Sequence, residues 1–248
     1  MMLNDCAILI LAAGKGKRMI SKRAKVLHKL NNKSLISYVI NTALQITKNC
    51  IVVVGHQSEE VKKEILNVEK NIDFALQREQ LGTGHATLCA MPLIKDNIKS
   101  IIILYGDVPL LSVGSINELI DFHNKKNNTV TILSMKIENP TGYGRLIIEN
   151  DSVIEIVEES DASVIQKDIK IVNSGVYMVK KDFLNESLEY IDNKNTQNEF
   201  YLTDIIKIAG LKKEKVGHIN IKNANELKGI NDKNQLMELE QLLKNKVL

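Results

Sequence analysis

The apolar positions divide the first half of the chain into alternating strands and helices. Short aliphatic runs bounded by polar residues occur at Ala7–Ala12, Ile51–Val54 and Ile101–Leu104. Continuous apolar runs of this length are typical of strands covered on both faces, as in a parallel sheet. Amphipathic helical patterns occupy Ser34–Ile46, Ser58–Leu66 and Ser115–Lys125. The order β-α-β-α-β predicts a doubly wound α/β fold of the nucleotide-binding type.

The helical pattern at Ser34–Ile46 has a well-defined apolar stripe. The stripe consists of Leu35, Ile36, Val39, Ile40, Ala43 and Leu44. A stripe with this spacing faces a core. Ser34 precedes it, and a serine hydroxyl at that position can accept a hydrogen bond from a free amide of the first turn. Ser34 is therefore available as an N-cap of this helix.

The pattern changes after Thr129, where β-rich segments follow one another. These segments are Thr129–Ile137, Arg145–Glu149, Val153–Val157 and Ile171–Val179. The turn residues Asn150 and Asp151 separate two of them, as in a hairpin. We interpret this region as an extension of the sheet that carries a second substrate, in addition to the nucleotide expected from the fold of the first half. The whole sheet is then mixed but mostly parallel, and helices flank it.

The last part of the chain contains two more helical patterns and one more strand. The helices are expected at Leu202–Leu211 and Asp232–Lys246, and the strand at Val216–Ile221. The apolar side of the final helix packs either on its own domain or on a partner. No internal repeat or low-complexity segment interrupts the chain. We expect one domain over residues 1–231, followed by a C-terminal helical arm over residues 232–248.

The composition narrows the class of protein. Of 248 residues, 44% are hydrophobic and 25% are charged, as in ordinary globular proteins. The net charge is only +3, aromatic residues make up 4% and Trp is absent, so no nucleic-acid partner is expected. No segment reaches the length of a membrane span, about 18 apolar residues. Cys6, Cys50 and Cys89 are widely spaced in apolar surroundings, which favours reduced thiols in a cytoplasmic protein.

A cationic, glycine-rich turn follows the first predicted strand. Gly14 and Gly16 alternate with Lys15, Lys17 and Arg18, and Lys25 lies just downstream. Glycines let backbone amides approach a ligand, and cations this close repel one another unless an anion lies among them. The spacing fits neither the Walker loop nor the dinucleotide fingerprint. The turn therefore indicates a polyphosphate site, with a solvated basic turn as the alternative.

An acidic residue follows the strand Ile101–Leu104. Asp107 lies after Tyr105 and Gly106, at the carboxyl end of that strand, where open α/β sheets bind ligands. A carboxylate in this place is suited to Mg²⁺, which shares oxygen ligands with substrate phosphates. The alternative is an aspartate that caps a strand-end turn.

A third candidate segment, Gln77–Ala86, places amide side chains before a glycine-rich entry into a helical pattern. The paired donor and acceptor of a glutamine suit the edge of a pyrimidine, although an ordinary loop-to-helix junction has the same pattern. The sequence contains no Gly-x-Ser-x-Gly elbow, no His-Glu-x-x-His and no Cys-x-x-Cys, which removes support for common hydrolase and zinc sites.

These segments form one recognisable set in chain order. The set comprises Leu11–Met19, Lys25–Leu27, Gln80–Ala86, Tyr105–Pro109, Pro140–Leu146, Val157-Glu158 with Asp161-Ala162, Asn173–Gly175, Glu199–Asp204 and Gly229–Asn231. It resembles the uridylyltransferase domain of the bacterial bifunctional UDP-N-acetylglucosamine pyrophosphorylase/glucosamine-1-phosphate acetyltransferases, the GlmU family. The resemblance extends over nearly the whole chain, and the later motifs are specific to this branch of the sugar nucleotidyltransferases.

The resemblance implies a fold and a reaction. The fold would be the Rossmann-like nucleotide-diphospho-sugar transferase fold. The reaction would convert UTP and N-acetylglucosamine-1-phosphate to UDP-N-acetylglucosamine and pyrophosphate, for cell-envelope precursors. The alternatives are a related sugar-1-phosphate nucleotidyltransferase with another sugar or pyrimidine triphosphate, and a nucleotide-sugar-binding protein without turnover.

The resemblance also implies roles for individual residues. Arg18 would contact the leaving pyrophosphate, Lys25 would contact the phosphates at the reacting centre, and Asp107 and Asn231 would hold Mg²⁺. The residues implied for the nucleotide are Leu11, Ala12, Ala13, Gly14, Gly16, Gln77, Gly82 and Thr83. Those implied for the sugar are Tyr105, Gly142, Glu158 and Asn173.

The chain departs from the family pattern in a few places. Lys17 stands where the family usually has Thr, Ser160 replaces a common Lys and Lys228 replaces a common acid. The sequence ends at Leu248, where the family continues into a left-handed β-helix with the acetyltransferase and the trimer contacts. We expect either a part of a longer protein or a single-function form. In both cases no acetyltransferase domain is expected in this chain.

Overall fold

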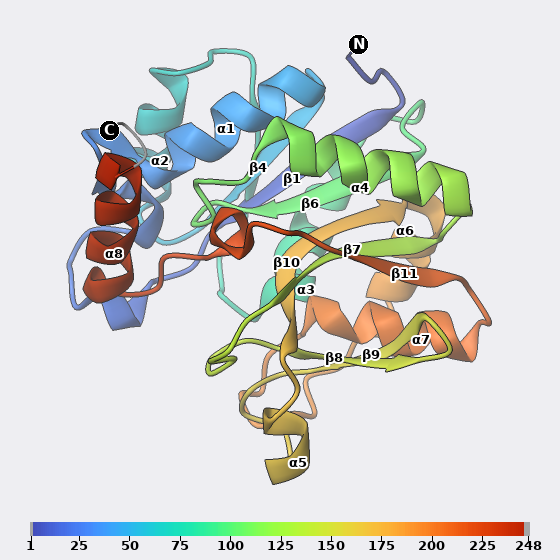
Figure 1. Ribbon diagram of the computed structural model, residues 1–248. Helices are drawn as coiled ribbons and strands as arrows, with labels where there is room; N and C mark the ends of the chain where they lie inside the picture. The colour runs from blue at the N-terminus through green and yellow to red at the C-terminus, as the bar shows by residue number, and fades with distance from the viewer. Residues whose placement is uncertain (1, 246–248) are drawn as a thin grey trace.

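The computed structural model describes residues 2–245, and the side chains of all of these except Lys17 and Asn245. A nine-stranded mixed sheet forms its centre (Figure 1). The strands of the main path are, in spatial order, β11 (Val216–Asn220), β7 (Val130–Lys136), β10 (Ile171–Lys180), β6 (Ser100–Tyr105), β1 (Cys6–Ala12), β4 (Cys50–Val54) and β5 (Asp73–Leu76). Strand β10 runs antiparallel to β6 and β7, whereas the other neighbours on this path are parallel. The prediction of a mixed but mostly parallel sheet is confirmed.

A hairpin extends the sheet beyond the main path. It consists of β8 (Arg145–Glu149) and β9 (Ser152–Val157), and β8 also pairs with β10. Asn150 and Asp151 connect the two strands with φ angles of 49° and 62°. Such left-handed pairs match the twist of a two-residue hairpin. The hairpin predicted from these turn residues is confirmed.

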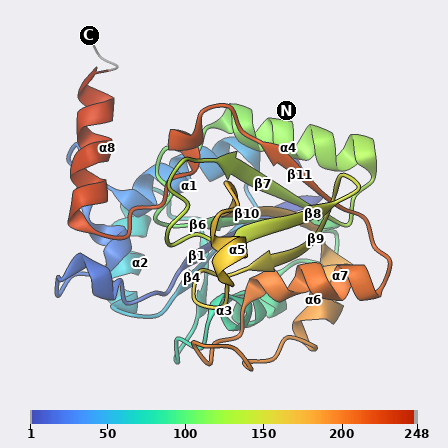
Figure 2. The same ribbon diagram turned by 60° about the horizontal axis from the view of Figure 1, so that its bottom comes forward.

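Helices cover both faces of the sheet (Figures 1 and 2). One face carries α1 (Leu35–Ile46), α2 (Ser58–Leu66) and α4 (Val113–Lys126), and the other carries α3 (Thr83–Ala90), α6 (Lys181–Leu188) and α7 (Ile205–Leu211). Successive residues of β1 alternate between the two cores, because Ile8 and Ile10 pack with the first group and Leu9 with the second. Burial on both faces explains why the strands have continuous apolar sequences.

The remaining elements are short or lie at the edges. They are β2 (Lys29–Leu30), β3 (Lys33–Ser34), α5 (Val164–Lys167), α8 (Lys233–Asn245) and the 3₁₀ turns η1 (Lys17–Met19), η2 (Lys25–Leu27), η3 (Met91–Leu93), η4 (Leu202–Asp204) and η5 (Ala224–Leu227). The predicted helix Leu202–Leu211 is thus η4 followed by α7. The predicted end of the last helix at Lys246 lies outside the described residues.

The sequence patterns did not predict β5 and α6, and the available cap Ser34 has the predicted position but not the capping hydrogen bond. Ser34 occupies the N-cap position of α1, but its side chain makes no capping hydrogen bond. Its hydroxyl oxygen lies 2.5 Å from the hydroxyl oxygen of Ser37, and both residues are buried. The two hydroxyls therefore satisfy each other instead of the helix terminus.

Helix α8 lies at one end of the molecule in both views (Figures 1 and 2). Leu239 is 3% exposed and packs with Met19, Leu30, Leu35 and Ile230. Leu236, Leu242 and Leu243 pack against the same cluster. The apolar side of this helix therefore packs on its own chain, next to residues that adjoin Arg18 and Asn231.

Leu239→Ala should lower the free energy of unfolding by about 2–5 kcal/mol, because it removes buried methyl groups and leaves a cavity. Urea denaturation followed by far-UV circular dichroism measures the change. Met237 lies on the same helix but is 53% exposed, so it is the matched control. Met237→Ala should change the free energy by less than about 0.5 kcal/mol. Equal effects of the two substitutions would contradict the packing of α8 described above.

Candidate active site

A cavity of about 530 Å³ opens where β1, β5 and β6 end. Most of the residues that the sequence singled out line it: Leu11, Ala12, Ala13, Gly14, Gly16, Arg18, Lys25, Gln77, Gly82, Thr83, Tyr105, Asp107 and Asn231. Gly142, Glu158 and Asn173 lie outside this lining. Gln197 and Glu199 line the cavity although the sequence analysis gave neither a role. Glu199 belongs to a quoted motif, so a signal existed for it but not for Gln197.

The turn after β1 is held by its neighbours through the backbone. Gly106 donates to the carbonyl of Leu11 over 3.0 Å, and Met19 donates to the carbonyl of Gly16 over 2.9 Å. Gly16 has a φ of +61°, and a Cβ there would lie 2.6 Å from the Cβ of Lys25. Gly14 differs, because a Cβ there would meet no protein atom within 4 Å. Gly16 is therefore needed to fold the turn, whereas Gly14 leaves open space beside its backbone.

A compact charged cluster lies at one end of the cavity. The Lys25 ammonium pairs with a carboxylate oxygen of Asp107 and donates to Oδ1 of Asn231 over 3.1 Å. Arg18 donates to the same Asn231 oxygen over 3.0 Å. The amide of Ile230 donates to the carbonyl of Asp107 over 2.9 Å. This backbone bond brings Asn231, from the C-terminal region, to the end of β6.

The oxygens of Asp107 and Asn231 fit a small divalent cation. Both contact the Lys25 ammonium, so they converge on one point of positive charge. A carboxylate and an amide oxygen belong to the donor set that Mg²⁺ prefers, and Mg²⁺ takes its other ligands from water and substrate phosphates. Within residues 2–245, no group of three or more His, Cys, Asp or Glu side chains forms a metal cluster. A metal here would take its remaining ligands from water or from a substrate.

The other end of the cavity is lined by the turn that precedes α3. Gln77 is 3% exposed, and its Nε2 donates to the carbonyl of Gly82 over 3.0 Å. Phe200 donates to the carbonyl of Leu81 over 2.8 Å and accepts from Gly84 over 2.8 Å. Thr83 accepts from the amide of Leu202 over 3.0 Å. These bonds fix the turn against the segment after α6.

The residues implied for the sugar are already hydrogen-bonded within the chain. Asn173 donates to the Tyr177 hydroxyl over 2.6 Å and accepts from the amide of Gly175 over 2.9 Å. Glu158 accepts from the Thr203 hydroxyl over 3.3 Å, and burial raises the pKa of this carboxyl. Burial also raises the pKa of the Tyr105 hydroxyl, with a smaller contribution from the Glu158 charge.

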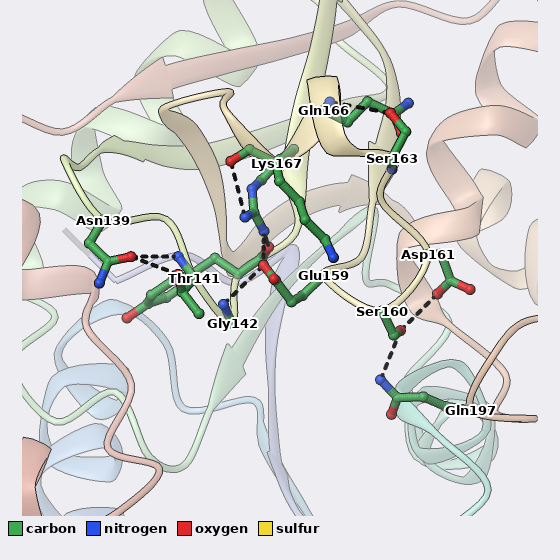
Figure 3. A network of polar contacts seen from close by, with 12 residues as sticks. Asn139, Thr141, Gly142, Glu159, Ser160, Asp161, Ser163, Gln166, Lys167 and Gln197 are labelled. Carbon is green, nitrogen blue, oxygen red and sulfur yellow. Dashed lines mark hydrogen bonds and ion pairs between the residues drawn. The ribbon is translucent and has the colours of Figure 1, made fainter.

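A polar network holds the loop that contains Gly142 (Figure 3). Gly142 donates its amide to Oε2 of Glu159 over 3.1 Å, and the buried Arg145 donates to the same oxygen over 2.5 Å. Ser160, one of the departures from the family pattern, donates to Asp161 over 3.0 Å and accepts from Gln197 over 3.3 Å. The side chain of Lys17, another departure, lies outside the described part of the chain. The loops beside Glu158 are thus connected to the cavity wall through Gln197.

This fold and site define a class. Residues 7–224 match the model of the nucleotidyl transferase family, and the chain belongs to that family. It is a nucleotidyltransferase, in agreement with the sequence analysis. Over the part of the chain that the structure describes, no helix is both long and apolar enough to span a bilayer.

The curated relatives to which the chain is similar include two bacterial proteins that are each named Bifunctional protein GlmU. It is 40% identical to that of Acetivibrio thermocellus over 242 residues, which are 97% of this chain and 52% of the relative. It is 43% identical to that of Thermosipho melanesiensis over 239 residues, which are 96% of this chain and 51% of the relative. The chain thus spans about half the length of these relatives.

Two solved structures share the fold. A UDP-glucose pyrophosphorylase complexed with UDP-glucose superposes with a TM-score of 0.75 at 17% identity, covering 99% of this chain and 100% of the other. A putative glucose-1-phosphate thymidylyltransferase from Bacillus anthracis gives 0.70 at 18% identity, covering 97% and 96%. At these identities the likeness concerns the fold alone, and it confirms the predicted Rossmann-like transferase architecture.

The two glycines of the turn should respond differently to alanine. Gly14→Ala should leave the melting temperature unchanged but raise the KM for the nucleotide by about tenfold, because the new methyl group occupies the space beside the backbone that a phosphate would use. Gly16→Ala should lower the free energy of unfolding by more than about 1–2 kcal/mol, because alanine is strained at this φ and its Cβ would also collide with the Cβ of Lys25. Differential scanning fluorimetry measures the stability of each variant, and steady-state kinetics measures its KM for the nucleotide. An unchanged nucleotide KM in Gly14→Ala would rule out backbone approach at that residue.

Proposed function

We propose that this chain is a uridylyltransferase that converts UTP and N-acetylglucosamine-1-phosphate to UDP-N-acetylglucosamine and pyrophosphate. The observation that carries the proposal is the cavity at the ends of β1, β5 and β6, which has an amide and a glycine turn at one end and a cluster of cations and oxygens at the other. A pyrimidine nucleoside triphosphate has the matching order of base, ribose and phosphates. The motif set and the relatives named GlmU support the same assignment.

In the proposed reaction, an oxygen of the sugar phosphate attacks the α-phosphorus of UTP in line, and pyrophosphate leaves. Arg18 binds the departing pyrophosphate, and Lys25 stabilises the charge that develops at the reacting phosphate. The attacking oxygen is already ionised near neutral pH, so no general base is required. The main tasks of the protein are positioning and charge stabilisation.

We propose Mg²⁺ as the divalent ion, because nucleotidyltransferases generally use a divalent metal and the oxygens here suit magnesium. Asp107 and Asn231 would hold it. When bound, the ion neutralises phosphate charge and orients the phosphates. Lys25, which contacts both residues in the described structure, would then direct its ammonium to the phosphates.

The remaining assignments follow the same proposal. Backbone groups of the first turn, from Leu11 through Gly16, would bind the triphosphate, and Gln77, Gly82 and Thr83 would bind the uridine. Tyr105, Gly142, Glu158 and Asn173 would bind the sugar. Residues 1–231 would form the catalytic domain, with the arm after it. A cytoplasmic location is supported by the free thiols of its three cysteines.

A substrate panel tests the proposed function directly. Pyrophosphate release should be fastest with UTP and N-acetylglucosamine-1-phosphate, by about tenfold or more over CTP or over other sugar-1-phosphates. A coupled pyrophosphate assay across UTP, CTP and dTTP, each with several sugar-1-phosphates, provides the measurement. Faster release with a different sugar or nucleotide would replace the assignment, and nucleotide binding without release for any pair would identify a protein that binds without turnover.

Asp107→Asn should reduce turnover on the order of a hundredfold or more while preserving the fold, because it removes the charged ligand of the proposed metal site. Rates are measured over a series of Mg²⁺ concentrations, and circular dichroism checks the fold. Asp121→Asn is the control, since Asp121 is exposed on α4 and is not part of the cavity lining. Wild-type rates in Asp107→Asn would exclude Asp107 as a metal ligand.

A further inference from the structure

Gln77 lies directly after β5 and continues its pairing with β4. Its amide donates to the carbonyl of Val54 over 2.8 Å, so the backbone at this residue is part of the sheet. Its side chain is almost completely buried and lines the cavity. The side-chain amide therefore has a defined position from which to meet a base.

The orientation of the Gln77 amide group follows from chemistry. The carbonyl oxygen of Gly82 can only accept a hydrogen bond, so the Gln77 atom 3.0 Å from it must be the nitrogen, Nε2. The same nitrogen lies 3.1 Å from Nδ1 of His85. Both hydrogens of Nε2 thus have partners, one at Gly82 and one at His85.

This arrangement leaves the oxygen of Gln77 for a ligand. Oε1 has no hydrogen-bond partner among the described residues. It is also absent from the fully buried polar atoms without a partner in this part of the chain, so some of its surface is exposed. It is therefore accessible from the cavity that Gln77 lines. The cavity presents an acceptor at this point and no N–H of Gln77.

His85 supports this arrangement from behind the cavity wall. It lies in the first turn of α3 and is not part of the cavity lining. Because Nδ1 must accept from Gln77, the ring hydrogen lies on Nε2. His85 Nε2 is 3.8 Å from the sulfur of Cys89, one turn further along α3, and a thiol sulfur can accept this N–H. The neighbours on both sides therefore favour one tautomer.

We propose that His85 is a positioning residue that determines which base the enzyme accepts. By accepting from Gln77, it keeps the amide oxygen directed at the cavity, where the oxygen accepts from the N3–H of uracil. Cytosine has an unprotonated N3 in the same place, and two acceptors facing each other are unfavourable. The proposal rests on the proposed function, because it concerns the base of the nucleotide substrate.

The test compares nucleotides in His85→Leu, which removes the acceptor, and in His85→Asn, whose side-chain oxygen can replace Nδ1. In His85→Leu, the ratio of kcat/KM for UTP to that for CTP should fall about fivefold to tenfold, the effect of one neutral hydrogen bond. The change should appear in KM, with kcat for UTP near the wild-type value, because the base is remote from the reacting phosphorus. His85→Asn should retain the wild-type ratio.

The nucleotide dTTP is the control ligand, because thymine also has an N3–H. The ratio of kcat/KM for UTP to that for dTTP should stay constant in both variants. General damage to the site would not lower the ratio of UTP to CTP while leaving the ratio of UTP to dTTP unchanged. Independently of any variant, ¹⁵N NMR of the wild-type protein should show His85 with its hydrogen on Nε2. A hydrogen on Nδ1, or an unchanged ratio of UTP to CTP in His85→Leu, would overturn the proposal. If the wild type itself preferred CTP, the proposed function would fail, and the two failures are thus distinguishable.

Discussion

Asp107 is a carboxylate at the end of a buried strand, and its need for a cation organises the centre of this molecule. The residue is 7% exposed, and a buried charge is costly unless an opposite charge accompanies it. In the described structure the ammonium of Lys25 provides that charge, and Asn231 provides a second oxygen for it. The same pairing restrains the turn that carries Arg18, because Arg18 also donates to Asn231. A polyphosphate and its metal ion are the kind of ligand that could exchange with these partners without leaving a charge uncompensated.

Two backbone constraints bring these groups together from distant parts of the sequence. The parallel pairing of β1 with β6 places the first turn beside Asp107 at one edge of the sheet. The bond from Ile230 to the carbonyl of Asp107 then adds a segment from the other end of the chain. Leu239 and its neighbours pack over Met19 and Ile230, so the arm-like helix covers the outside of this junction. The apolar cluster thus supports the polar one, although it contributes no group to the cavity.

Sequence patterns predicted the parts of this molecule that depend on local periodicity. The strands β1, β4 and β6 were predicted to within one or two residues, because burial on both faces requires continuous apolar runs. Strand β5 was missed, since at the edge of the sheet only Ala75 of its four residues is buried. Helix α6 was missed because eight residues give a short periodic signal.

In the site too, the sequence predicted which residues take part but not how they contact residues that are distant in the chain. The glycines and cations of the turn are visible in the sequence, but the different demands on Gly14 and Gly16 depend on where Lys25 packs. Likewise, the sequence indicates that the amide of Gln77 suits a base, whereas the identity of its free atom depends on Gly82 and His85. The contact between Lys25 and Asn231 joins residues 206 positions apart, which no periodicity encodes.

The two ends of the proposed substrate would meet different kinds of site. On the nucleotide side, backbone bonds between Phe200 and the turn before α3 fix the polar groups, and the open oxygen of Gln77 needs no rearrangement to bind. On the sugar side, Gly142 already donates to Glu159, and Asn173 already donates to Tyr177. A sugar that used these groups would have to replace intramolecular hydrogen bonds or use their remaining lone pairs and hydrogens. Each exchange gains little net free energy, because one hydrogen bond replaces another. Selectivity on this side would therefore come mainly from the penalty for a sugar that leaves one of these groups unpaired, whereas preorganised groups would set the preference for the base.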